Sequence, residues 1–65
     1  MSDKGATAFR AACRSGSGLT VYKEFADQAS AETWARANVN NFHQIVVEAL
    51  EGGGWKVRAT FHNQS

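Results

Sequence analysis

The sequence predicts an α+β domain in which four mostly antiparallel strands form one sheet and a single helix packs on one face of it. Three observations support this prediction. Apolar and polar residues alternate in the segments 8–14, 19–25 and 55–62, which is the period of a β-strand. Two runs rich in glycine lie where hairpin turns would join strands. Apolar residues recur with helical spacing in 26–39, so the expected order is ββαββ.

The first predicted hairpin joins the segments 8–14 and 19–25. The run Ser15-Gly16-Ser17-Gly18 between them supplies glycine where a turn needs positive φ angles. One face of the first strand carries Phe9, Ala11 and Cys13. The other face carries Arg10, Ala12 and Arg14. Neither strand is stable alone in water, so this hairpin must pair with further strands or pack against the helix.

The helix predicted over 26–39 buries one apolar stripe against the sheet. The members of this stripe, spaced i, i+3, i+4 and i+8, are Ala31, Trp34, Ala35 and Val39. This stripe is centred on Trp34, and we expect the burial of Trp34 against the sheet to contribute ~3–5 kcal/mol. Asp27 and Ser30 are both candidate N-caps, and the pair Asn40-Asn41 can end the helix in the left-handed conformation.

The segment 43–50 has two interpretations. Its Ile45-Val46-Val47 triplet and the glycine run that follows favour a strand, whereas Glu48-Ala49-Leu50 are good helix formers. As a strand, it forms a second hairpin with 55–62 through the turn Gly52-Gly53-Gly54. We expect this arrangement. It places Trp55, Val57, Ala59 and Phe61 on the core side of the sheet.

The length of 65 residues allows one domain with a single small core. The residues expected in that core are Phe9, Ala11, Leu19, Val21, Phe25, Trp34, Ala35, Val39, Ile45, Val47, Trp55, Val57 and Phe61. We expect residues 1–7 to be disordered, 8–62 to form the domain and 63–65 to be a frayed tail. We expect the chain to be a complete small gene product.

Composition limits the cellular setting. The hydrophobic fraction of 43% is typical of a globular chain, and the net charge of +1 excludes a strongly basic nucleic-acid-binding tail. A single cysteine, Cys13, excludes an internal disulfide. No apolar run approaches the ~18 residues of a membrane span, and the N-terminus lacks the apolar region of a signal peptide. We therefore expect a cytoplasmic protein without a membrane partner.

No motif for catalysis, cofactor binding or metal binding is present. His43 and His62 with one cysteine lack the ligand number and spacing of a zinc site. Cys13 at a core-side strand position is expected to be a small buried hydrophobe. The glycines of 52–54 lack the following helix and lysine of a phosphate-binding loop. We therefore expect a protein that is not an enzyme and has no catalytic residues, cofactor or metal.

One helix leaves the other face of a four-stranded sheet uncovered, and this face is the candidate contact surface. The residues expected to bind a partner there are Arg10, Arg14, Tyr22, Lys56, Arg58 and His62. Its four arginines and lysines exceed its two glutamates, Glu24 and Glu48, by two charges. A protein partner is the first hypothesis. Single-stranded nucleic acid stacked on Tyr22 is the second. A homodimer, formed through Val46 and Leu50 or through edge strands, is the third. The alternative to all three is a plain solvated face with cross-strand ion pairs, which carries the largest weight.

Two resemblances bear on function. A hairpin ending in Phe25, followed by a helix with Ala31, Trp34 and Ala35, resembles the small N-terminal module of phage-type integrases over residues 8–37. The size and ββαββ layout of the whole chain are similar to those of small phage-encoded inhibitors, including anti-CRISPR proteins and RNA-polymerase inhibitors. The second resemblance implies a phage or mobile-element protein that binds and blocks a larger nucleic-acid-processing machine through its open sheet face.

Overall fold

The computed structural model describes residues 6–63 and confirms an α+β fold of four antiparallel strands and one helix in the order ββαββ. Its elements are β1 (Ala6–Arg14), β2 (Thr20–Phe25), α1 (Gln28–Asn38), the 3₁₀ turn η2 (Val39–Asn41), β3 (Gln44–Glu51) and β4 (Gly54–His62). The segment 43–50 is therefore a strand and not a second helix. Most of the expected disordered N-terminus lies outside the described residues, and β1 already begins at Ala6.

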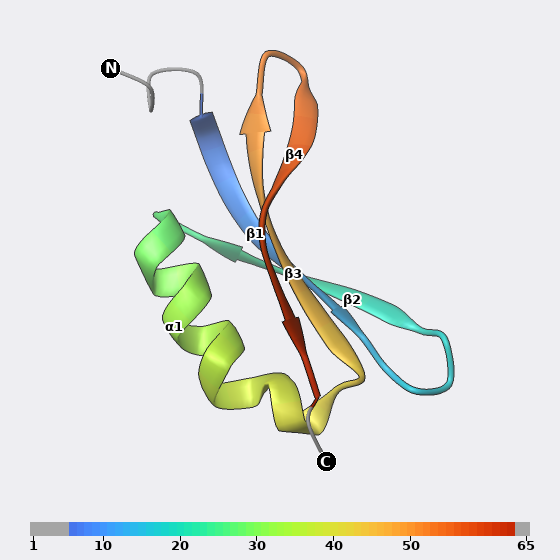
Figure 1. Ribbon diagram of the computed structural model, residues 1–65. Helices are drawn as coiled ribbons and strands as arrows, with labels where there is room; N and C mark the ends of the chain where they lie inside the picture. Colours follow the sequence, from blue (N-terminus) through green and yellow to red (C-terminus); the bar gives the residue numbers. More distant parts are fainter. Residues whose placement is uncertain (1–5, 64–65) are drawn as a thin grey trace.

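The strand order is β2-β1-β3-β4, and every neighbouring pair is antiparallel. The helix α1 lies across one side of the twisted sheet (Figure 1). It connects the edge strand β2 to the central strand β3, which run in the same direction with β1 between them. Both outer strands, β2 and β4, therefore present one unpaired edge to solvent.

The N-cap of α1 is one of the two predicted candidates, whereas its C-terminal end differs from the prediction. The Asp27 side chain accepts a hydrogen bond of 2.7 Å from the Ser30 backbone N–H, so Asp27 is the N-cap. The predicted left-handed ending at Asn40-Asn41 is wrong, because positive φ angles within residues 6–63 occur only at glycine. The helix instead tightens into η2, and the Asn38 amide donates to the Trp34 carbonyl at 2.8 Å.

The end of β4 is connected to the loop before β3. The Asn63 side-chain amide donates to the Phe42 carbonyl at 2.9 Å and to the Asn40 carbonyl at 3.2 Å. The Asn63 backbone N–H donates to the His43 carbonyl at 3.2 Å. Asn63, the first residue of the expected frayed tail, is thus held in place, and the rest of that tail lies outside the described residues.

The core is built on small helix residues and not on Trp34. Ala31 and Ala35 are fully buried against the sheet, where the largest fully buried side chains are Ile45, Val47 and Cys13. Alanine lets the helix backbone approach the strands closely, which pushes a large side chain such as Trp34 to the flank. Trp34 is half-buried there, with its ring centroid 5.7 Å from that of Phe25 and 6.4 Å from that of Phe42. Trp34 therefore packs on the core as expected, but it is only partly buried.

The second hairpin contains a β-bulge that changes which side chains face the helix. Gly52 and Gly53 have φ angles of 57° and 87°, which is a two-residue type I′ turn with Glu51 opposite Gly54. This turn places Trp55 opposite Leu50, on the side away from α1. Further along, Val47 pairs with Ala59 and Glu48 pairs with Val57, which leaves Arg58 without a partner in the ladder. The bulge at Arg58 returns Ala59 and Phe61 to the helix side.

Four residues expected in the core lie outside it. Trp55 and Val57 face away from α1 because the two-residue turn places them opposite Leu50 and Glu48, and Val57 is 62% exposed. Leu19 and Val21 are on the helix side by their register, yet 70% and 59% of their surface is exposed. The turn that joins β1 to β2 extends away from α1 (Figure 1), so no helix residue covers this end of the hairpin.

Candidate functional site

The candidate site is the open face, by which we mean the side of the sheet opposite α1. No other element of the described chain covers it (Figure 1). Its members, assigned from the strand registers, are Ala8, Arg10, Ala12, Arg14, Thr20, Tyr22, Glu24, Gln44, Val46, Glu48, Leu50, Trp55, Val57, Thr60 and His62. Four of the six predicted contact residues are therefore on one face: Arg10, Arg14, Tyr22 and His62.

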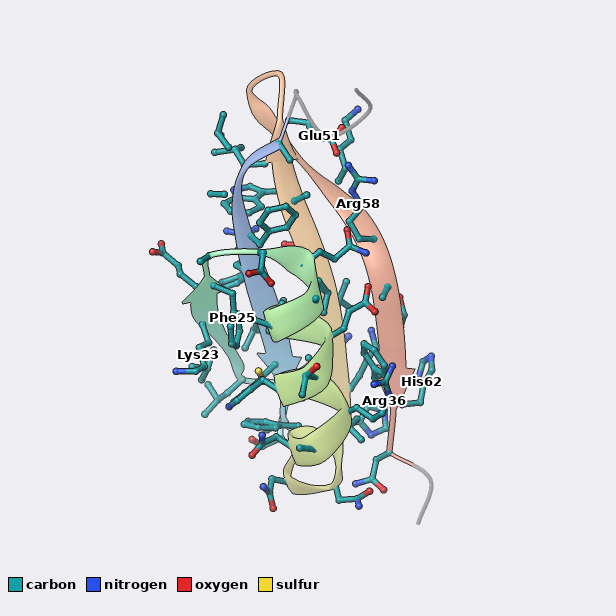
Figure 2. The ribbon with its side chains drawn as sticks, turned by 90° about the vertical axis from the view of Figure 1, so that its left-hand side faces the viewer. Lys23, Phe25, Arg36, Glu51, Arg58 and His62 are labelled. Carbon is teal, nitrogen blue, oxygen red and sulfur yellow. The ribbon has the colours of Figure 1, made fainter. Side chains whose placement is uncertain are left out.

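The other two predicted contact residues lie elsewhere, which corrects the sequence-based assignment. Lys56 pairs with Ala49, whose side chain is fully buried on the helix side, so Lys56 belongs to that side as well. Arg58 at the bulge forms an ion pair with Glu51. Figure 2 shows the Arg58 and Glu51 side chains close together beside β4, at the end of the sheet that α1 leaves uncovered. The physical reason is that the turn sets the faces of residues 54–57 and the bulge at Arg58 then shifts the alternation of side chains along β4.

The centre of the open face is a cluster of Arg10, Tyr22, Glu48 and Trp55, which we call the Arg10 cluster. The guanidinium carbon of Arg10 lies 4.2 Å from the Tyr22 ring centroid and 4.0 Å from the Trp55 ring centroid. The Nε–H of Arg10 donates to Glu48 Oε1 at 2.7 Å. These residues come one from each strand, so a single side chain connects all four strands across the open face.

Neighbouring positions explain why this cluster can form. Ala12 is opposite Tyr22, and Ala8 is opposite Leu50, so small side chains flank Arg10 along β1. This leaves room above β1 for the tyrosine ring, which approaches from β2. The Trp55 ring reaches Arg10 from β4 across the intervening strand β3. The cluster is thus a consequence of alternating small and large residues on neighbouring strands.

The charges of the open face balance. Its ionised groups are Arg10, Arg14, Glu24 and Glu48. Two basic and two acidic groups replace the excess of two positive charges that the sequence predicted, because Lys56 and Arg58 are not on this face. Arg10 is already paired with Glu48, and both side chains are mostly buried, at 23% and 18% exposure. The face therefore offers little attraction for a phosphate backbone.

The open face also exposes apolar surface. Tyr22 is 55% exposed and Val57 is 62% exposed. Val46 and Leu50 lie between them on the central strand β3 and are half-buried. These side chains share the open face with the Trp55 ring, which lies beside the Arg10 guanidinium. Aromatic, aliphatic and arginine side chains of this kind are typical of the buried centre of a protein–protein interface.

The residues considered for chemistry do not come together. Within residues 6–63, no three His, Cys, Asp or Glu side chains are grouped so that they could hold a metal ion. His43 and His62 are both exposed. The Cys13 thiol is 1% exposed. Burial raises the pKa of this thiol, and the positive charge of Lys23 opposes the shift. Cys13 therefore stays protonated and packs as a small core side chain.

Two residues of the site, Trp55 and Val57, were missed from the sequence. A signal for them exists in the turn, because two consecutive glycines can form a two-residue type I′ turn. That turn length makes Gly54 the first residue of β4 and puts Trp55 opposite Leu50. The strict alternation from Trp55 to Phe61 instead favoured Trp55 and Val57 on the helix side. The residue types of β4 do not indicate the bulge.

No helix within the described ranges is long and apolar enough to cross a membrane. Comparisons with known proteins add no relative: no protein-family model, curated protein or solved structure matches this chain.

Proposed function

We propose that this chain is a non-enzymatic interaction protein that binds a protein partner through its open face and acts by occupying the partner's surface. The observation that carries the proposal is the Arg10 cluster, surrounded by exposed apolar side chains on a face with balanced charge. Tryptophan, tyrosine and arginine are the residues most enriched among those that dominate binding energy.

The Arg10 cluster is suited to this role because it is already ordered without a partner. Arg10 contacts two rings and a carboxylate in the free chain, so binding would freeze few additional rotamers. Its charge is compensated by Glu48, which lowers the cost of removing water from the guanidinium. A partner would thus meet a preformed surface with little entropic or electrostatic cost.

The size of the open face sets the expected affinity. Four strands spaced about 4.8 Å apart and rows spanning about 25 Å give a contact area on the order of 500 Å². A standard stable interface buries roughly 800 Å² on each partner. We therefore expect a transient complex with a dissociation constant on the order of micromolar.

Nucleic acid is the less favoured partner. Zero net charge on the open face and the engagement of Arg10 with Glu48 support a protein partner instead. The two cases differ in salt dependence, because phosphate contacts release counterions and neutral contacts do not. We expect the affinity to change by less than about threefold between 50 and 200 mM salt, whereas several phosphate contacts would change it by ~10³ or more.

The direct test uses two variants that differ only in the face they alter. Val57→Glu places a charge on the open face, and Val21→Glu places the same charge on the helix side of the opposite edge strand. The two valines are similarly exposed, at 62% and 59%. With each variant as bait in the native host lysate, we expect Val57→Glu to lose partners that the parent chain and Val21→Glu retain. Equal capture by all three baits would remove the open face from consideration.

The resemblance to phage-encoded inhibitors leads to a narrower form of the proposal. In this form, the partner is a component of a nucleic-acid-processing machine, and binding blocks that machine without turnover. An activity assay of any enzyme captured by the bait, with and without a stoichiometric amount of this chain, tests the blocking step. Unchanged enzyme activity at saturation would contradict inhibition while leaving the binding surface intact.

A further inference from the structure

The outer edge of β2 is exposed along almost its whole length. All five residues from Thr20 to Glu24 are exposed. Among residues 6–63, the exposed large hydrophobic side chains are Leu19, Val21, Tyr22 and Val57, so three of the four belong to this strand or to the residue before it. The other edge strand, β4, is protected by a bulge and by cations at Lys56 and Arg58. An edge like that of β2 is a ready template for another strand.

The phase of the backbone hydrogen bonds shows which groups this edge offers. The Ser15 N–H donates to the Leu19 carbonyl at 2.8 Å, which continues the register that pairs Cys13 with Val21. Odd-numbered residues of β2 therefore exchange hydrogen bonds with β1. The N–H and C=O groups of the even-numbered residues Thr20, Tyr22 and Glu24 point outward to the free edge, where another strand can satisfy them.

We propose that β2 pairs with β2 of a second copy of this chain, antiparallel and centred on Tyr22. The two-fold axis then places Tyr22 opposite Tyr22 and Thr20 opposite Glu24, and all of these residues have outward-pointing backbone groups. This register forms about six inter-strand hydrogen bonds. The interface is isologous, because the same strand contributes from both copies, so association stops at the dimer.

Side chains on the helix side fit the same register. Leu19, which is 70% exposed in the free chain, comes opposite Phe25 of the second copy. Phe25 contacts Trp34, with ring centroids 5.7 Å apart, so Leu19 extends an existing apolar cluster. Val21 comes opposite Lys23 of the second copy, whose aliphatic stem can cover it. The dimer thus shields two of the exposed hydrophobic side chains on each copy.

Charges on the open face also match across this interface. Arg14 and Glu24 are exposed, and neither forms an ion pair within the described chain. In the proposed register, Thr20 lies between Arg14 of its own chain and Glu24 of the second copy. Because Thr20 is short, the arginine can reach over it to that carboxylate. The two-fold axis makes this pair twice, so two unpaired charges on each copy become complementary.

Neighbouring registers fit less well. Centring the pair on Val21 leaves only Thr20 and Tyr22 among the outward-pointing groups in register, so fewer hydrogen bonds form. Centring it on Lys23 places two ammonium groups directly opposite each other.

The Tyr22 register also makes one eight-stranded sheet with both open faces on the same side. The dimer inference does not depend on the proposed function, since it uses the strand edge and not the face.

The test measures sedimentation equilibrium over a series of concentrations. We expect a concentration-dependent rise from the 7.0 kDa chain mass to twice that value. Val21→Lys puts a like charge opposite Lys23 of the second copy in two places, and we expect it to weaken association about tenfold. Val21→Glu puts an opposite charge there and should leave association equal or stronger. Val57→Lys, on the other edge strand, is the matched control that should not change it.

Amide hydrogen exchange gives a readout specific to the edge. In the parent chain, we expect protection of the Thr20, Tyr22 and Glu24 amides to rise with concentration, whereas the β1-bonded amides of Val21 and Lys23 are protected throughout. A monomer at every concentration up to about 1 mM would overturn the inference. So would equal weakening by Val21→Lys and Val21→Glu, or a dimer disrupted by Val57→Lys, since both outcomes place the interface elsewhere.

Discussion

The Arg10 cluster leads to a quantitative prediction about stability. Arg10→Ala removes the contacts with both rings and the hydrogen bond to Glu48 at once. Each cation–π contact at a partly exposed site contributes ~0.5–1 kcal/mol. The charge-assisted hydrogen bond, between side chains that are about one-fifth exposed, contributes about 1 kcal/mol. We therefore expect the free energy of unfolding to fall by about 2–3 kcal/mol, a large share of a small domain's total.

The assay is urea unfolding followed by circular dichroism, with Arg14→Ala as the matched control. Arg14 is on the same strand and the same face as Arg10, but it is exposed and forms no ion pair in the part of the chain that the structure describes. Its replacement should change stability by less than about 0.5 kcal/mol. Arg10→Lys should recover only part of the loss, because an ammonium group lacks the planar surface that stacks on rings.

Equal stability of Arg10→Ala and Arg14→Ala would refute the reasoning, since it would mean that the cluster contributes nothing to holding the four strands together. Trp55 fluorescence gives a second check at the same site, although Trp34 also emits. A double variant, Trp34→Phe with Arg10→Ala, isolates the Trp55 signal. We expect its emission to shift to longer wavelength than in Trp34→Phe alone, because the ring loses its cover and meets water.

Two further predictions concern the second hairpin and the buried thiol. Gly52 has a φ of 57° and no atom within 4 Å of an added Cβ, so only its backbone conformation restricts the residue type. In urea unfolding, Gly52→Val should lower the free energy of unfolding by about 1–2 kcal/mol, whereas Gly52→Asn should leave it almost unchanged. Burial raises the pKa of Cys13, so the unfolded chain loses this proton first. Stability should therefore fall as pH rises from the ordinary thiol pKa through the raised one, and a Cys13→Ala chain should lack that part of the fall; equal alkaline slopes would contradict it.

The bulge at Arg58 shows why the candidate site was only partly predictable. Four predicted residues are on the open face. Three of them, Arg10, Arg14 and Tyr22, lie in strands whose alternation is uninterrupted. The fourth, His62, lies after the bulge, where the alternation again agrees with the predicted one. Two requirements compete within β4. The glycine turn puts Trp55 on the open face, whereas packing beneath α1 needs Phe61 on the other face. Strict alternation would put Trp55 and Phe61 on the same face, because an even number of positions separates them. Placing them on opposite faces therefore leaves one residue between them unpaired.

The sequence by itself determined the number, type and order of the elements, favoured a strand at Gln44–Glu51 and limited the N-cap to Asp27 or Ser30. These features depend on interactions within a few residues along the chain, so residue type and spacing are enough to indicate them. Only the tertiary structure decided the strand order, the deeper burial of Ala31 and Ala35 than of Trp34, and the membership of the open face. Those depend on how strands align with one another and how closely the helix approaches them, and both follow from contacts between residues far apart in sequence.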